Sequence, residues 1–171
     1  MGRFFGGIVA WALLALFPAS AWAEGPWLTD YAKAKEQAAA EGKPMLLDFT
    51  GSDWCPYCIA LEKNVLSTPV FLNYAKKSLV LVTLDHPKYK TLPDEELRQS
   101  LEMRRKYEIK EVPTLILLSP DEKVLYRGGE QQEGAAGFVA LLRKAAPSTS
   151  ASGEAADPFA AFAAKPDGAT P

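Results

Sequence analysis

The chain contains two cysteines, Cys55 and Cys58, in the sequence Trp54-Cys55-Pro56-Tyr57-Cys58. A disulfide between them closes a very short loop, which constrains the unfolded chain too little to contribute much stability. Two residues between cysteines let the two sulfurs meet within one helical turn. The pair is therefore better suited to redox chemistry than to cross-linking the fold.

The place of Cys55 along the chain favours reactivity. The motif follows an apolar run at 45–49 and begins a predicted helix over 55–66. At a helix N-terminus, unpaired N–H groups and the helix dipole favour a thiolate, which is the reactive form. Pro56 fits the first helical turn. We expect Cys55 to attack a substrate disulfide and Cys58, further inside and more buried, to resolve the mixed disulfide.

Predicted helices and strands alternate in the order α-β-α-β-α-β-β-α. Helix-favouring composition marks five segments: 30–41, 55–66, one that starts at Thr68-Pro69, 94–107, and about 135–145. Short apolar runs mark four strands, the last two as a hairpin: 45–49, 79–84, 114–118 and 124–127. We expect an α/β domain whose mixed central sheet is flanked by helices on both faces.

Four short motifs follow one another along residues 31–142. Leu47-Asp48-Phe49 comes first, then the cysteine motif, then Val112-Pro113-Thr114 before a strand, and then Gly128 after the hairpin. In this order they resemble the thioredoxin family. A lone C-x-x-C is a weak signal, whereas the whole series in the family's order is a strong one. The resemblance implies a thioredoxin fold and a protein thiol–disulfide oxidoreductase, with the Cys55–Cys58 disulfide as its redox group and no other cofactor.

The resemblance also implies roles for two residues outside the cysteine motif. Pro113 corresponds to the family's cis-proline, which faces the cysteines and leaves the Val112 backbone free to pair with a substrate strand. Asp48 corresponds to the family's buried acid. Burial raises the pKa of such a carboxyl, which then relays a proton to and from Cys58, through water. The alternative is a strand-end aspartate that reaches solvent.

A substrate groove is expected around the cysteines. The residues that we expect to line it are Trp54, Pro56, Tyr57, Val112, Pro113 and Gly128. Trp54 and Tyr57 can also be interpreted as core residues, although their place next to the nucleophile favours the groove. The Pro-Tyr dipeptide is typical of glutaredoxins and affects the redox potential. Both directions of electron flow stay open, with reduction of substrates preferred.

Three departures from the family pattern affect the surroundings of the site. Six residues separate Asp48 from Cys55, one more than in the shortest family pattern, which predicts a bulged loop. The strand at 79–84 carries no lysine to pair with the buried acid. The segment 85–107 is longer than the usual connection, and we expect it to add a loop or a longer helix near the groove.

The two ends of the chain differ from the domain at 24–146. Residues 1–23 read as an export signal, with Arg3, an apolar stretch at 4–17 and an Ala21-Trp22-Ala23 cleavage site. An uncleaved anchor is the alternative, since 4–23 is just long enough to span a bilayer. Residues 147–171 are rich in Ala, Ser, Pro and Gly and are predicted to be a disordered tail. The expected location is periplasmic or secreted.

Composition restricts the partners. The formal net charge is -2, without the basic patch that nucleic-acid binding requires. We expect a monomer that meets protein thiols and disulfides and a membrane redox partner. Two cysteines and the lone His86 do not make a zinc site, and no metal site is expected. Two other functions stay open: Cu(I) binding by the two thiols, and a redox-inert binding module on the same fold.

Overall fold

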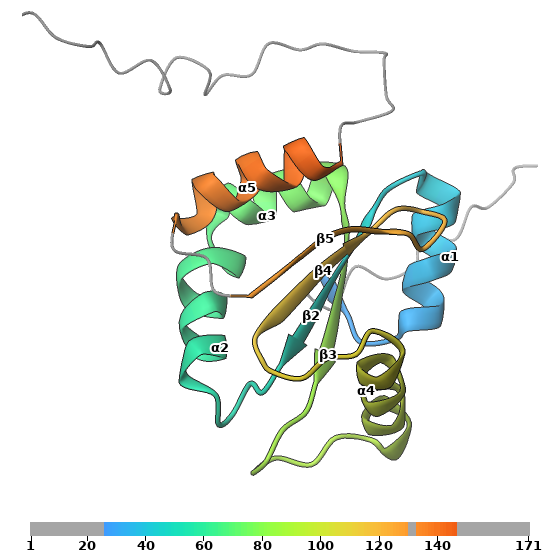
Figure 1. The fold of residues 1–171 in the computed structure, drawn as a ribbon, viewed down its shortest axis with the longest axis vertical. Coiled ribbons are helices and arrows are strands. Elements are labelled where there is room, and N and C mark those ends of the chain that lie inside the picture. The colour runs from blue at the N-terminus through green and yellow to red at the C-terminus, as the bar shows by residue number, and fades with distance from the viewer. Residues whose placement is uncertain (1–25, 130–132, 147–171) are drawn as a thin grey trace, which may run out of the picture.

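A five-stranded mixed sheet forms the centre of the molecule (Figure 1). The computed structural model describes residues 26–129 and 133–146, so the predicted export signal and tail lie outside the described residues. The strands, in spatial order, are β1 (Trp27–Leu28), β3 (Val80–Asp85), β2 (Met45–Thr50), β4 (Thr114–Leu118) and β5 (Val124–Gly128). β1, β3 and β2 are parallel, whereas β4 and β5 run antiparallel to their neighbours. The predicted α/β architecture is confirmed.

Helices cover both faces of this sheet, as Figure 1 shows. They are α1 (Tyr31–Glu41), α2 (Pro56–Leu61), α3 (Pro69–Ser78), α4 (Asp94–Lys106) and α5 (Gly134–Ala145). α1 and α4 pack on one face, and α2, α3 and α5 on the other. Among the described residues, none of these helices is long and apolar enough to cross a bilayer.

The central strand β2 is buried along its whole length. Its side chains alternate between the two layers. Met45, Leu47 and Phe49 join the core under α1 and α4, whereas Leu46 joins the core under α2, α3 and α5. Asp48 is two residues after Leu46, so its side chain is on the same face of the sheet and points toward the layer that contains α2.

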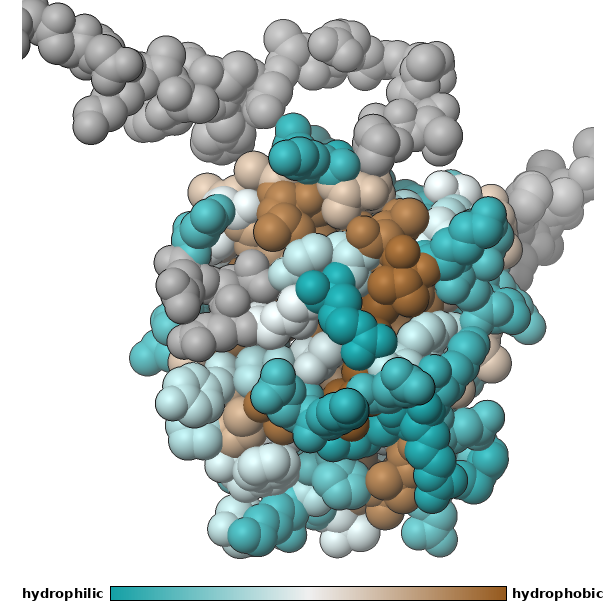
Figure 2. Space-filling view, viewed as in Figure 1, coloured by the Kyte–Doolittle hydropathy of each residue, from teal (hydrophilic) through white to brown (hydrophobic). Residues whose placement is uncertain are grey.

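Local signals set the helix ends. The Asp30 side chain accepts a hydrogen bond from the Lys33 N–H and caps α1, and Gly42 ends that helix with a φ of 63°. Thr68 caps α3 in the same way. The helix predicted over 55–66 is not uniform, because its second half, Glu62–Leu66, is a π-helical turn. In the view of Figure 2 the surface is mostly hydrophilic, and apolar residues gather mainly in its upper half.

Candidate active site

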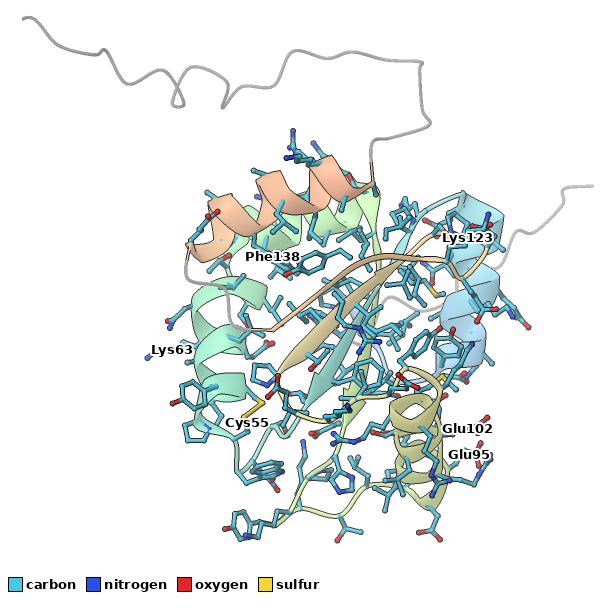
Figure 3. The ribbon with its side chains drawn as sticks, in the orientation of Figure 1. Cys55, Lys63, Glu95, Glu102, Lys123 and Phe138 are labelled. Atoms are coloured by element: carbon cyan, nitrogen blue, oxygen red, sulfur yellow. A yellow bond between two sulfur atoms is a disulfide. The ribbon has the colours of Figure 1, made fainter. Side chains whose placement is uncertain are left out.

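Cys55 lies where the connection from β2 enters α2, and it is the N-cap of that helix. Its backbone is extended, and its Sγ accepts a hydrogen bond from the Cys58 N–H at 3.2 Å. Pro56 fills the first helical position, where a missing N–H costs no helical hydrogen bond. A disulfide joins Cys55 to Cys58, with 5.2 Å between the two Cα atoms (Figure 3). The helix end thus holds the two sulfurs and directs the Cys58 N–H at the first.

The two cysteines are equally covered, at 3% exposed each. The prediction that Cys58 is more buried than Cys55 is therefore wrong. Cys55 is as buried as Cys58 because the loop before β4 covers it. The Cys55 Sγ lies 3.6 Å from the Val112 carbonyl oxygen in that loop. The Val112–Pro113 peptide bond is cis. What distinguishes the two sulfurs is their place on α2, not their exposure.

Asp48 is buried in the sheet beneath α2. Its Oδ1 has no hydrogen-bond partner among the described residues. Burial raises the pKa of the Asp48 carboxyl to about 8, and the nearby charges of Glu62 and Asp85 act in the same direction. The alternative of a strand-end aspartate in contact with solvent is wrong. A carboxyl kept neutral at lower pH can give or take a proton close to neutrality.

Asp48 and Cys58 both line a cavity of about 580 Å³. Its lining consists of Trp27, Asp48, Thr50, Ser52, Cys58, Ile59, Glu62, Lys63, Ser67, Thr83, Asp85 and Lys90. This space is large enough and polar enough to hold water. A proton can therefore pass between the Cys58 thiol and the Asp48 carboxyl through water.

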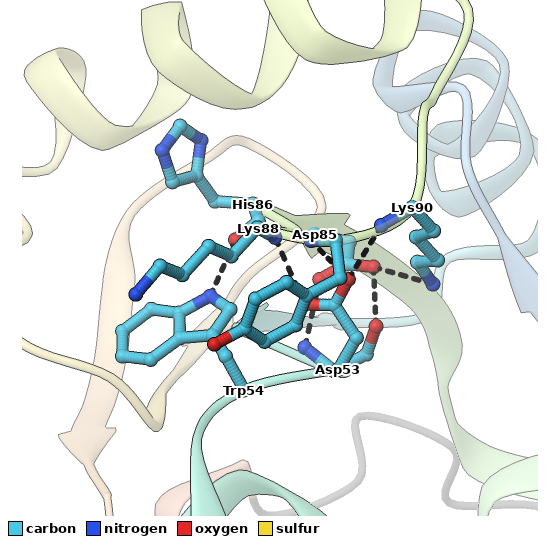
Figure 4. Close-up of polar contacts among 8 residues, drawn as sticks. Asp53, Trp54, Asp85, His86, Lys88 and Lys90 are labelled. Atoms are coloured by element: carbon cyan, nitrogen blue, oxygen red, sulfur yellow. Dashed lines mark hydrogen bonds and ion pairs between the residues drawn. The ribbon is translucent and has the colours of Figure 1, made fainter.

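A loop after β3 is tied to the loop that carries the cysteine motif (Figure 4). The Asp53 carboxylate accepts hydrogen bonds from the backbone N–H groups of Lys88, Tyr89 and Lys90, at 2.8 to 2.9 Å. The Trp54 Nε1–H donates to the His86 carbonyl oxygen at 2.8 Å. The long segment after residue 85 thus adds a loop that is anchored beside the site.

Aromatic side chains stand exposed around the motif. Trp54 is 41% exposed and Tyr57 is 64% exposed, so the interpretation of these two as core residues is wrong. Exposed aromatic rings next to a disulfide offer apolar contact area to a protein that approaches it.

The family model described as thioredoxin-like matches residues 26–120, more than half of the chain. The chain belongs to the thioredoxin-like family. Disulfide bond reductase DsbH of Chlamydia pneumoniae is 32% identical to it over 115 residues, which are 67% of this chain and 69% of that protein. The thioredoxin-related protein DsbJ of the same organism is 33% identical over 103 residues, 60% of this chain but 30% of that protein.

Solved structures agree with this assignment. A structure of DsbH oxidoreductase superimposes with a TM-score of 0.66 at 32% identity, covering 70% of this chain and 82% of the other. A thioredoxin from Thermus thermophilus superimposes with a TM-score of 0.55 at 24% identity, covering 69% of this chain and 84% of the thioredoxin chain. At this identity the likeness shows the shared fold alone. With the Cys55–Cys58 disulfide in place, this thioredoxin-like protein is a thiol–disulfide oxidoreductase.

Two adjacent glycines at the end of β5 have different surroundings. Gly128 pairs with Leu115 inside the sheet. The next residue, Gly129, is the glycine that approaches the loop before β4, because a Cβ there would lie 2.5 Å from the Pro113 carbonyl oxygen. The sequence Gly128-Gly129 alone does not show which of the two glycines lies against the loop before β4. Sequence reasoning also missed the hydrogen bonds by which Asp53 holds the loop after β3.

Proposed function

We propose that this thioredoxin-like protein is exported to the periplasm and reduces disulfides of protein substrates through Cys55 and Cys58. The observation that carries the proposal is the shared cavity, whose lining includes both the buried Asp48 and the second cysteine of the pair. The name of the relative DsbH, a disulfide bond reductase, supports the direction. The export signal expected at 1–23 supports the location.

The reaction begins with the reduced protein. The Cys55 thiolate, stabilised by the N-terminus of α2, attacks one sulfur of a substrate disulfide, and the other substrate sulfur leaves as a thiolate. Cys58 gives its proton to the Asp48 carboxylate through water. The Cys58 thiolate attacks the Cys55 sulfur, and the bond to the substrate breaks. The substrate gains two electrons and leaves as two thiolates, while Cys55 and Cys58 become a disulfide. Asp48 returns its proton through water to one of these thiolates, and any further proton that the substrate takes up comes from solvent, because Cys55 began as a thiolate.

The pKa of Asp48 suits this role. At about 8 it lies close to that of an ordinary thiol, about 8.5, so neither direction of proton transfer is strongly uphill. Trp54 and Tyr57 offer exposed rings to the substrate, and the Val112 backbone offers hydrogen bonds to an extended segment. A membrane protein with a dithiol returns the protein to its reduced form, and the protein acts as a monomer.

The reduction potential of the Cys55–Cys58 pair tests the direction. The protein is equilibrated with glutathione at known ratios, and alkylated thiols are counted by mass. A potential near or below that of thioredoxin, about −270 mV, supports a reductase. A potential above about −180 mV indicates an oxidant or isomerase. If no reversible disulfide forms, the redox proposal fails, and Cu(I) binding or an inert binding module takes its place.

The N-terminus of the protein recovered from cells tests the location. We expect the mature chain to begin at Glu24 and to be released by osmotic shock of a Gram-negative host. A variant with Ala21 and Ala23 replaced by bulky residues serves as the uncleaved control, because those two side chains face the signal peptidase. A wild-type chain that keeps residues 1–23 and sediments with membranes contradicts cleavage and supports the anchor.

A further inference from the structure

An ion pair lies at the cavity that Asp48 shares with Cys58. The Lys90 Nζ is 2.8 Å from the Asp85 Oδ2, and both residues line that cavity. The Asp85 side chain is 9% exposed and that of Lys90 is 50% exposed. Asp85 ends β3 and Lys90 follows in the anchored loop, so the pair places a buried anion and a half-exposed cation on the wall of the cavity that Asp48 also lines.

Both members of the pair are held by the loop that carries the cysteine motif (Figure 4). Ser52 donates to the Asp85 carboxylate from its backbone N–H at 3.0 Å and from its Oγ at 2.6 Å. The backbone N–H of Lys90 donates to Asp53 at 2.8 Å. The position of the Lys90 charge is therefore coupled to the segment that ends at Cys55.

The charges that face Asp48 come from two sides of the cavity. The ionisable side chains of the lining, besides Asp48 and Cys58, are Glu62 and Lys63 from the π-helical turn, Asp85 from β3 and Lys90 from the loop. The neighbours of Asp48 in the sheet, Thr83 on β3 and Leu115 on β4, carry no charge. A second carboxylate in such a space opposes the ionisation of Asp48 unless a cation accompanies it.

We propose that Lys90 is a positioning residue for the proton step at Cys58: it compensates the Asp85 charge, so that Asp48 can accept the thiol proton as a carboxylate. This inference rests on the proposed role of Asp48. Burial raises the pKa of Asp85, but the hydrogen bond from Lys90 and those from Ser52 bring it below its usual value. Asp85 thus remains charged, and Lys90 is the cation on it.

The titration of the Asp48 carboxyl tests the inference directly. Its ¹³C shift is followed with pH in the oxidised protein and in the variants Lys90→Met, Asp85→Asn and the double variant. We expect the Asp48 midpoint to rise by roughly one pH unit in Lys90→Met and to fall by a similar amount in Asp85→Asn. Lys88→Met is the matched control, since the Lys88 side chain lies over the Tyr89 ring and does not line the cavity.

Two NMR outcomes overturn the inference. One is an unchanged midpoint in Lys90→Met, and the other is an equal shift in Lys88→Met. The double variant tests the pairing: without the Asp85 carboxylate, Lys90 is no longer held at the cavity, so Lys90→Met has a smaller effect in the Asp85→Asn background. An equal effect in both backgrounds shows that Lys90 acts independently of Asp85, and the pairing is rejected.

The rate of disulfide closure separates this inference from the proposed function. A Cys55–glutathione mixed disulfide is prepared, and closure by Cys58 is timed across pH. We expect the profile to move with the Asp48 midpoint in Lys90→Met and to be insensitive to Lys90 in the Asp48→Asn background. If Asp48→Asn closes at the wild-type rate, the role of Asp48 fails and the inference falls with it. If Asp48→Asn is slow but Lys90→Met leaves the profile unmoved, only the inference fails.

Discussion

Two acidic side chains in different parts of the domain differ in their partners and, as a result, in the direction of their pKa shifts. Asp48 lies beneath α2, its Oδ1 has no hydrogen-bond partner among the described residues, and burial raises its pKa to about 8. Glu122 lies in the β4–β5 turn, where hydrogen bonds lower its pKa to about 2. Its partners, the strongest first, are Lys106, Lys35 and Tyr31.

The difference follows from what each region does. In Figure 3, Cys55 and Lys123, the neighbour of Glu122, lie at opposite corners of the molecule. Around Glu122, ion pairs and the Tyr31 hydroxyl tie the hairpin to α1 and α4, and a group so well satisfied does not exchange protons near neutral pH. In the part of the chain that the structure describes, the Asp48 Oδ1 has no such partner, which costs stability. That cost supports the proton-transfer role that we propose for Asp48.

The largest expected effect comes from making Asp48 unable to ionise. Asp48→Asn keeps the shape of the side chain, and we expect it to slow reduction of a protein disulfide by about 100-fold near pH 7.5, the usual size of general acid–base catalysis. Turnover of insulin disulfides measures this. Glu122→Gln, the same change in the other region, is expected to keep the wild-type rate, and equal slowing by both variants contradicts the comparison.

The same variant changes how stability depends on pH. Between about pH 4 and pH 8 the unfolded chain ionises Asp48 while the folded protein keeps it protonated, so wild-type stability falls as pH rises. Relative to the wild type, Asp48→Asn gains about 1.4 kcal/mol per pH unit, or about 2 to 3 kcal/mol between pH 5 and pH 7. Urea unfolding of the oxidised proteins at both pH values gives this difference. A constant difference means that Asp48 titrates normally.

Glu122→Gln is expected to have the opposite pH behaviour. Because the folded pKa of Glu122 is lowered, its stabilisation is present above the unfolded value of about 4.5 and is lost as pH falls toward 2. We expect the variant to lose about 1 to 2 kcal/mol of unfolding free energy at pH 7, and much less at pH 2.5. Thermal or urea unfolding at the two pH values measures it, and a loss that is larger in acid rejects this account of Glu122.

The smallest effect concerns the contact between the two loops at the active-site end. Trp54→Phe removes the N–H that donates to His86 but keeps an exposed aromatic ring. We expect a loss of about 1 kcal/mol in unfolding free energy, together with faster amide hydrogen exchange at 88–90. Tyr57→Phe is the control, since it changes an exposed ring of the same motif. If exchange at 88–90 is unchanged in Trp54→Phe, the Trp54 contact does not hold this loop.

Local patterns made much of the fold predictable. The helix over 30–41 has a capping aspartate before it and a glycine after it, and the structure places α1 there. The apolar runs at 45–49, 79–84 and 114–118 became buried strands because both faces of the sheet are covered. The burial of Asp48 followed from its place in one of those runs. Such features depend on residues that are close in the sequence.

Features that depend on distant residues were not predictable. β1 is two residues long, too short for any periodic pattern, and exists through pairing with Leu81 and Val82. The hydrogen bonds of Asp53 reach backbone groups about 35 residues away and leave no trace in composition. The equal burial of Cys55 and Cys58 depends on the loop at Val112, which only the folded chain brings near.

Trapping the mixed disulfide tests most directly the claim that Cys55 attacks and Cys58 resolves, since their exposure does not distinguish them. Reduced Cys58→Ser and Cys55→Ser proteins are each mixed with a disulfide-bonded substrate protein, quenched by acid and alkylation, and analysed by mass. The account predicts that Cys58→Ser accumulates a covalent adduct at Cys55 and that Cys55→Ser accumulates none. An adduct at Cys58 in Cys55→Ser, formed as fast as the first, would contradict it.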